Sequence, residues 1–230
     1  MTRATPLPHQ AILKQAAADF RYLLDRGYPR AASLTLVGNR YNLSRTARQM
    51  LHRGVFAAVA ARARQAKLQH LEEISGLALA VDGHNVLITL ESALRGRPLV
   101  LADDGFVRDV AELSRAFRAS RDTELALELL AAYLQRHQPG PVTVLYDAPM
   151  SKSGELARHT REVFAATGLA VEARAVPVPE QELLGFPGAV ATSDTHLIDA
   201  RDRLVDLAGE IIRQETGRGR QFHLVVLKDT

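Results

Sequence analysis

Residues 77–85 read LALAVDGHN, an apolar run that ends in an aspartate, Asp82, and a glycine turn. Short apolar runs bounded by turn residues are typical of buried strands. Similar runs recur along the rest of the chain, at Leu99–Ala102, Val142–Tyr146, Val171–Val176, Ala189–Thr192 and Phe222–Leu227. We expect each of these runs to form one strand of a sheet.

Helical patterns separate most of the apolar runs. Apolar residues recur at helical spacing at about 106–117, 122–137, 152–167, 179–185 and 197–215. An alternation of strands and helices indicates a mainly parallel sheet with helices on both faces. The sequence therefore predicts an α/β domain over residues 76–230, in which the sheet is the middle one of three layers.

Acidic residues follow four of the predicted strands. The apolar runs lead into Asp82, into the pair Asp103 and Asp104, into Asp147 and, after one serine, into Asp194. The carboxyl ends of parallel strands meet at one edge of a sheet, where open α/β proteins bind their ligands. We therefore expect these carboxylates to lie close together at that edge.

Carboxylates that lie within a few ångströms of one another repel, and some must take up a proton unless a cation balances them. Mg²⁺ and Mn²⁺ prefer such oxygen ligands and can promote attack of water on a phosphorus centre. The pattern predicts a metal site held by Asp82, Asp147 and Asp194. Asp103 or Asp104 would be a further ligand or a base that orients water. The alternative is that these aspartates cap the helices that follow, because Asp is a favoured N-cap.

The string from Val81 to Val86, VDGHNV, resembles the opening motif V-D-G-x-N-V of NYN domains, which are ribonuclease relatives with a PIN-like fold. The late string VATSD, which ends at Asp194, is similar to the V-x-T-S-D motif of the same family. The resemblance implies that Asp82 and Asp194 belong to an acidic metal site, and that Asp147 is its middle strand-end acid. It also implies that Asn85 orients Asp82 or the phosphate, which completes the predicted catalytic set.

The whole chain is similar to a prokaryotic family that pairs a small helical domain, domain of unknown function 434, with a PIN-like domain. The strings that carry this resemblance are Arg26–Pro29, Leu36–Tyr41 and Asp103–Asp109. NYN domains usually have another acidic pair shortly before the T-S-D string, whereas this chain has Glu180 and Glu182 there. Either one of these glutamates replaces the pair, or the metal site has fewer ligands, or the chemistry has drifted.

Three further side chains are candidates for contact with a substrate phosphate. His84 can contact a phosphate or the catalytic water, or it can cover the first turn of the next helix. Lys152 lies in a polar turn that opens a helix, where backbone amides suit an anion. The hydroxyl of Ser193 can bind a phosphate or cap the helix that follows.

The N-terminal part of the chain is strongly basic. Residues 1–70 carry twelve Lys or Arg and two Asp, a net charge of +10, whereas the remaining residues carry seventeen bases and twenty-four acids. Helical patterns at about 9–26, 30–41 and 45–70 predict an all-α module over residues 1–72. Residues 32–51 resemble a helix-turn-helix, which would place Arg45 and Arg48 on or near a nucleic-acid recognition face. The alternative is a helical hairpin that packs on the second domain or on a second subunit in a homodimer.

Composition excludes several classes of protein. The chain has no cysteine, which excludes disulfides, thiolate metal sites and cysteine nucleophiles. No apolar run reaches the roughly 18 residues of a membrane helix, and no signal peptide is recognisable, so we expect a cytoplasmic protein without a membrane partner. The polar turn around Lys152 lacks the spacing of a nucleotide P-loop, which argues against an NTPase.

These observations predict a Mg²⁺- or Mn²⁺-dependent phosphodiesterase that acts on nucleic acid, with RNA favoured over DNA. A non-catalytic nucleic-acid-binding regulator is the first alternative. A phosphohydrolase of a small metabolite is the second, but the basic module argues against it. The D-x-D nucleophile motif of haloacid-dehalogenase phosphatases is also missing after the first strand.

Overall fold

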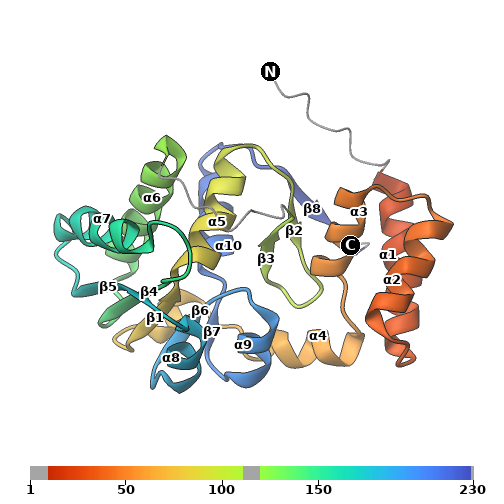
Figure 1. Ribbon diagram of the computed structural model, residues 1–230, viewed down its shortest axis with the longest axis horizontal. Coiled ribbons are helices and arrows are strands. Elements are labelled where there is room, and N and C mark those ends of the chain that lie inside the picture. Colours follow the sequence, from red (N-terminus) through yellow and green to blue (C-terminus); the bar gives the residue numbers. More distant parts are fainter. Residues whose placement is uncertain (1–9, 111–119, 229–230) are drawn as a thin grey trace.

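The computed structural model describes residues 10–110 and 120–228 (Figure 1). Helices alone occupy residues 10–74, and strands and helices alternate over most of the rest. The helices are α1 (Gln10–Asp25), α2 (Arg30–Arg40), α3 (Arg45–Gly54), α4 (Ala58–Gln65), the 3₁₀ helix η1 (Leu71–Ile74), α5 (Gly83–Leu94), α6 (Arg121–His137), α7 (Ser153–Ala165), α8 (Pro179–Gly185), α9 (Thr195–Ala200) and α10 (Leu207–Gly217). The strands are β1 (Leu79–Asp82), β2 (Leu99–Leu101), β3 (Val107–Asp109), β4 (Val142–Asp147), β5 (Val171–Val176), β6 (Ala189–Ala191), β7 (Leu204–Val205) and β8 (Leu224–Val226).

Five strands form one parallel sheet, in the order β5-β4-β1-β6-β7. The predicted parallel sheet is therefore confirmed. Leu79 of β1 pairs with Val142 of β4 on one side and with Ala189 of β6 on the other. Because β1 lies between β4 and β6, the carboxyl ends of these three strands are neighbours.

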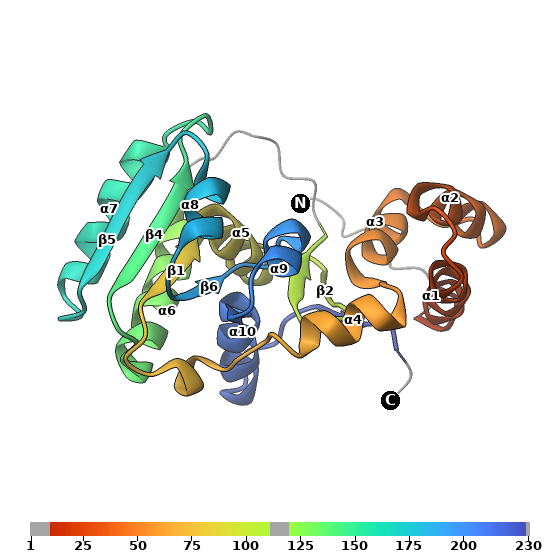
Figure 2. The same cartoon turned by 90° about the horizontal axis from the view of Figure 1, so that it is seen from below.

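Alternate side chains of β1 enter two different cores, as the pleat of a strand requires. Leu79 and Val81 belong to a core formed with α5, α6, α7 and α10. Ala80 belongs to a second core, to which α8 and α9 contribute Leu183 and Leu197. The sheet thus has helices on both faces, as Figures 1 and 2 show, in agreement with the predicted three-layer arrangement.

The second sheet is smaller and has the order β3-β2-β8. β2 and β3 are antiparallel and form a hairpin, while β8 runs parallel to β2. Gly105 lies in the hairpin turn with a φ of 88°, a conformation that favours glycine. The helix predicted over 106–117 is therefore wrong at β3, and residues 111–117 of that prediction lie outside the described residues.

Two of the long predicted helices are interrupted. The pattern at 45–70 forms α3 and α4, because the chain is extended at Val55, where α3 ends. The pattern at 197–215 forms α9, β7 and α10. Asp206 begins α10 anew, since its side chain accepts a hydrogen bond from the backbone N–H of Gly209.

The helical module packs directly on the small sheet. The buried face of α3 includes Met50 and Leu51, which share one core with Val100 of β2 and Val225 of β8. Of the two packing alternatives for the helical hairpin, the structure shows contact with the α/β domain.

No helix within residues 10–110 and 120–228 is long and apolar enough to cross a membrane.

Candidate functional site

Three acidic side chains lie on adjacent strands at the carboxyl edge of the main sheet. Asp82 ends β1, Asp147 ends β4, and Asp194 follows β6 after a short turn. The strand order places Asp82 between the other two. All three residues line one pocket of about 550 Å³, which we call the Asp82 pocket. The structure thus brings together the acids that end three of the four strands considered in the sequence.

The carboxylate of Asp82 is held from two sides. Its Oδ2 accepts a hydrogen bond from Thr192 Oγ1 at 2.9 Å, and its Oδ1 accepts one from the backbone N–H of Asn85 at 3.4 Å. Burial raises the pKa of Asp82 to about 6, the two hydrogen bonds oppose that shift, and the charges of Asp194 and Asp147 add to it. Perturbation by burial and by like charges in a cleft is typical of functional sites.

Asp194 and Asp82 also act as helix N-caps. Asp194 Oδ1 accepts hydrogen bonds from the backbone N–H groups of His196 and Leu197, at 2.9 and 3.1 Å, and so begins α9. Asp82 caps α5 through its bond from Asn85. The capping alternative considered for the strand-end aspartates is therefore observed for these two, and both still line the pocket. Asp147 caps no helix, because Lys152 precedes α7.

Asn85 links the ends of β1 and β6. Its side-chain oxygen accepts two hydrogen bonds from Ser193, one from the backbone N–H and one from the hydroxyl, both at 2.9 Å. The side chain therefore positions the segment that carries Asp194, while the hydrogen bond from Asn85 to Asp82 comes from its backbone N–H. Ser193, the donor of both bonds, is 8% exposed.

His84 is buried and lines the Asp82 pocket. Its Nδ1 accepts a hydrogen bond from the backbone N–H of Asp147 at 3.1 Å, and its ring lies edge-on to Tyr146. Burial lowers the pKa of His84, although the charge of Asp147 opposes that shift. A neutral ring that accepts at Nδ1 carries its proton on Nε2. His84 thus holds the end of β4 in place.

One of the two glutamates before Thr192 reaches the pocket. Glu180, in α8, lines it and forms an ion pair with His196. Glu182 points elsewhere, because its carboxylate binds Arg174 at 2.9 Å. Glu180 is therefore the better placed of the two for a role beside Asp82.

The oxygen donors of the Asp82 pocket suit a hard divalent cation in kind. Their spacing is looser than a finished metal site, because no group of three or more His, Asp or Glu in the described ranges already lies close enough to hold one ion. Asp194 is exposed and Asp147 is partly exposed, so both side chains have room to turn toward Asp82.

The family described as Domain of unknown function (DUF5616) matches residues 71–210. The chain belongs to this family. The family described as Protein of unknown function (DUF434) matches residues 12–67, which confirms the helical family predicted from the sequence. The Uncharacterized protein MJ0935 of Methanocaldococcus jannaschii is 33% identical over 202 residues, which are 87% of this chain and 96% of that protein. No solved structure gives a significant match.

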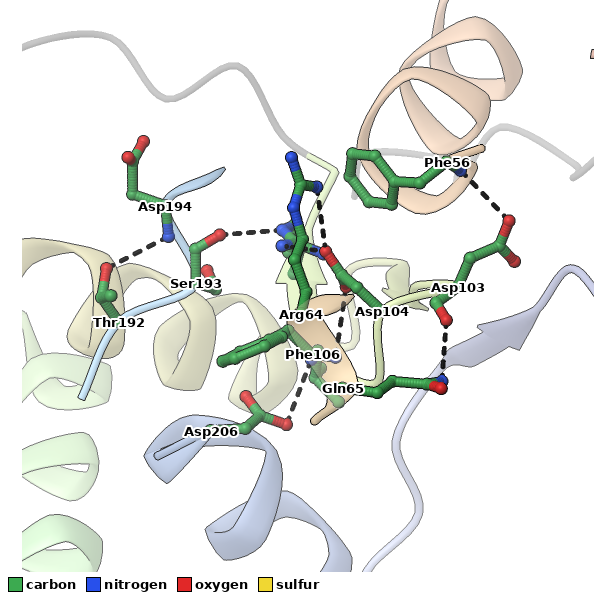
Figure 3. A network of polar contacts seen from close by, with 12 residues as sticks. Phe56, Arg64, Gln65, Asp103, Asp104, Phe106, Thr192, Ser193, Asp194 and Asp206 are labelled. Atoms are coloured by element: carbon green, nitrogen blue, oxygen red, sulfur yellow. Dashed lines mark hydrogen bonds and ion pairs between the residues drawn. The ribbon is translucent and has the colours of Figure 1, made fainter. Parts of the chain in front are cut away.

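Asp103 and Asp104 of this DUF5616 chain do not join the Asp82 pocket. They follow β2, which lies in the small sheet and not in the main sheet as expected. Asp103 accepts hydrogen bonds from Arg21, at 2.7 and 2.9 Å, and from the backbone N–H of Phe56 (Figure 3 shows the contact with Phe56). The prediction that these two acids are ligands beside Asp82 is wrong, because arginines occupy their carboxylates.

Asp104 is the centre of a buried network between the two parts of the chain. Its carboxylate binds Arg108 at 2.7 and 2.9 Å and Arg64 of α4 at 3.3 Å (Figure 3 shows the contact with Arg64). Arg108 also donates from Nε to the carbonyl oxygen of Ser193 at 2.8 Å. A chain of direct contacts therefore runs from the helical module to the segment that carries Asp194.

Lys152 lies outside the Asp82 pocket. It is exposed, has a φ of 64°, and forms an ion pair with Glu155 at 3.5 Å. It lines a different, smaller cavity of about 180 Å³. From the same loop, Met150 lines the Asp82 pocket. The structure gives no support to the predicted contact of Lys152 with a phosphate in that pocket.

Arg45 and Arg48 occupy the first turn of α3. Arg45 is exposed, as a recognition residue would be. Arg48 instead fixes the turn between α2 and α3, because Nε donates to the carbonyl oxygen of Leu43 at 3.0 Å and Nη2 donates to Asn39 at 2.9 Å. The side chain also lies against Gly38, where a Cβ would meet its guanidinium group. Arg48 is thus a structural residue of the module.

Proposed function

We propose that this chain is a Mg²⁺- or Mn²⁺-dependent phosphodiesterase that acts on nucleic acid, with RNA as the preferred substrate and DNA as the second choice. One observation carries the proposal: Asp82, Asp147 and Asp194 end or follow three adjacent parallel strands and line one pocket. The resemblance of the strings around Asp82 and Asp194 to a PIN-like NYN domain also supports a metal-dependent phosphodiesterase.

Electrostatics favour a cation in this pocket. Burial and the charges of Asp147 and Asp194 raise the pKa of Asp82 to about 6, so its ionised form is unfavourable compared with that of a free aspartate. A divalent cation removes this repulsion and needs the oxygen donors that the three side chains supply. Such a cation supplies activation of water and stabilisation of negative charge on phosphorus.

The chain's own residues would keep the carboxylates in place. Thr192 donates to Asp82, and Asn85 holds the backbone of Ser193 next to Asp194. The buried ring of His84 fixes the backbone of Asp147. Each acid of the proposed site therefore has a neighbour that restricts the strand end on which it lies.

The proposal is tested by incubating the purified chain with Mn²⁺ and with single-stranded or structured RNA. Asp82→Asn keeps the size of the side chain and removes its charge. Asp202→Asn is the matched control, because Asp202 is exposed and lies outside the Asp82 pocket. We expect the wild type and Asp202→Asn to cleave RNA and Asp82→Asn to lose cleavage. Cleavage that survives Asp82→Asn, or that is absent with every metal tried, contradicts the proposal.

A second candidate function is a nucleic-acid-binding regulator without catalysis. The looser spacing of the acids and the capping roles of Asp82 and Asp194 favour this alternative. It predicts binding of RNA or DNA that does not depend on metal, together with no cleavage by the wild type. The same cleavage assay, run beside a binding assay in EDTA, distinguishes the two.

A further inference from the structure

A second cleft lies between the helical module and the α/β domain, and its volume is about 540 Å³. We call it the arginine cleft. Most of the side chains that line it are basic or polar, and they include Arg30, His52, Arg53, Arg64, Arg108 and Thr195. Asn85 and Asp194 line both this cleft and the Asp82 pocket, so the two spaces are neighbours.

Some of these arginines form ion pairs with acidic residues that do not line the cleft. Asp104, which is fully buried, is shared by Arg64 and Arg108. Arg64 also binds Asp199, and Arg53 binds Asp109 at 3.1 Å. Among the residues that line the cleft, Asp194 is the acidic one, and it also lines the Asp82 pocket. These arginines line the cleft, whereas Asp104, Asp109 and Asp199, which pair with them, do not.

Arg30 differs from the other arginines of the cleft. It donates to the carbonyl oxygen of His52 and lies 4.8 Å from the ring of Phe56, but within the described residues it has no ion pair. Burial and repulsion by Arg64 and Arg108 lower the pKa of Arg30 to about 10. An anion beside Arg30 would relieve this repulsion.

The aromatic ring at the cleft is not available for stacking on a base. Phe56 is 7% exposed, and the guanidinium groups of Arg30, Arg64 and Arg108 lie 4.8, 4.5 and 5.2 Å from its ring centre. Single-strand binding that reads bases by stacking needs exposed rings. The cleft therefore suits the phosphate backbone of a strand and not its bases.

We propose that Arg30 and Arg53 bind a backbone phosphate of a nucleic-acid strand whose neighbouring phosphodiester lies in the Asp82 pocket. This inference rests on the proposed function, since it takes the Asp82 pocket as the place of cleavage. A strand carries phosphates in a row, so it can occupy two adjoining sites at once, which a single small anion cannot do. The helical module would then hold the substrate through the arginine cleft.

The test is the affinity of the full chain for a fluorescent single-stranded RNA, measured by anisotropy in EDTA over a series of salt concentrations. We expect Arg30→Gln and Arg53→Gln each to weaken binding about tenfold. Replacing both arginines by glutamine should also reduce the slope of log K against log salt by about 0.7, the value for one lost phosphate contact on a single strand. Arg62→Gln is the matched control, because Arg62 is exposed on α4 and does not line the cleft.

Melting curves establish whether each variant folds. If Arg30→Gln does not fold, the affinity of Arg53→Gln alone decides the test. Arg30→Lys keeps the charge and should restore part of the affinity. The inference is overturned if both glutamine variants bind RNA with the same affinity as Arg62→Gln. Inorganic phosphate and a mononucleotide serve as competitors, and competition as strong as that by RNA overturns the assignment to a strand.

The outcome also separates this inference from the proposed function. Asp82→Asn should keep its affinity for RNA in EDTA, because Arg30 and Arg53 are intact in that variant. RNA that binds through the two arginines but is not cleaved leaves the arginine cleft standing and rejects the phosphodiesterase. Cleavage that depends on Asp82, with unchanged binding in both arginine variants, leaves the phosphodiesterase standing and rejects the cleft.

Discussion

Arg108 and Asp104 form a two-pronged ion pair in which both side chains are buried, with Nη1–Oδ1 and Nη2–Oδ2 distances of 2.7 and 2.9 Å. Arg108 uses its third donor, Nε, on the carbonyl oxygen of Ser193. Arg64 of the helical module binds the same carboxylate. A single buried acid therefore connects the helical module, the small sheet and the segment beside the Asp82 pocket.

Replacing Asp104 tests this connection. Asp104→Ala leaves Arg108 and much of Arg64 buried without their shared counter-ion, and we expect the free energy of unfolding to fall by about 3–5 kcal/mol. Urea denaturation measures the change. Asp202→Ala, at an exposed position, should stay within about 0.5 kcal/mol of the wild type. Equal effects of the two substitutions would show that the network does not stabilise the fold.

Replacing Asn85 tests the link between β1 and β6. Asn85→Ala removes the acceptor for the backbone N–H and the hydroxyl of Ser193, which is 8% exposed, and should cost about 1–3 kcal/mol. We expect hydrogen exchange of the Ser193 amide to become faster. Ser193→Ala keeps the bond between its backbone N–H and Asn85, so its amide should still exchange slowly. An amide that exchanges equally fast in wild type and Asn85→Ala would rule out this role for Asn85.

Local patterns in the sequence predicted most of the large sheet. The apolar runs around Leu79, Val144 and Val190 became neighbouring strands, because buried parallel strands are short and apolar. That strand order also predicted that the acids at the strand ends lie at one edge of the sheet, as Asp82, Asp147 and Asp194 do. The family of the helical module also followed, from strings such as Arg26–Pro29.

The sequence did not predict which sheet β2 joins. A strand pattern predicts that a strand exists, but its partner depends on contacts between residues far apart in the chain, such as Leu99 with Leu224. Asp104 and Gly105 were the missed signal, because an Asp-Gly turn beside an apolar strand favours a hairpin. Because we predicted a helix over 106–117, we did not predict the hairpin. The contacts of Arg108 in the buried network were missed for the same reason.

The contact between the helical module and the small sheet can be tested at Gly54. A Cβ at this position would lie 2.5 Å from Val100 Cγ2 and 2.9 Å from Leu227 Cδ1. We expect Gly54→Ala to lower the free energy of unfolding by about 1–3 kcal/mol, because the core would be overpacked. Gly154→Ala in α7 is the control, since its Cβ would meet nothing within 4 Å and should be neutral or stabilising. A neutral Gly54→Ala would contradict close packing of α3 on the sheet.

Asp206 predicts a specific dependence of stability on pH. Burial raises its pKa from 3.8 to about 6, although Arg213 and two backbone amides oppose the shift. The folded state therefore holds the proton more tightly than the unfolded state. Its contribution to stability is complete below about pH 4 and is lost as the pH rises through about 6.

Asp206→Asn keeps an acceptor at the start of α10 and removes the titration. We expect the free energy of unfolding of the wild type, minus that of Asp206→Asn, to fall by on the order of 2 kcal/mol between about pH 4 and about pH 7. Contributions from Asp82 are the same in both proteins and cancel. Thermal or urea unfolding at a series of pH values measures this difference, and a flat or rising difference would refute the assignment.

A titration of Mn²⁺ followed by electron paramagnetic resonance tests whether the Asp82 pocket holds a divalent cation. The signal of free aqueous Mn²⁺ falls when the ion binds, whether or not any substrate is cleaved. We predict binding of one ion by the wild type and by Asp202→Asn, and loss of that binding in Asp82→Asn. A wild type that leaves the free-ion signal unchanged, or an Asp82→Asn variant that binds Mn²⁺ as the wild type does, would contradict the claim.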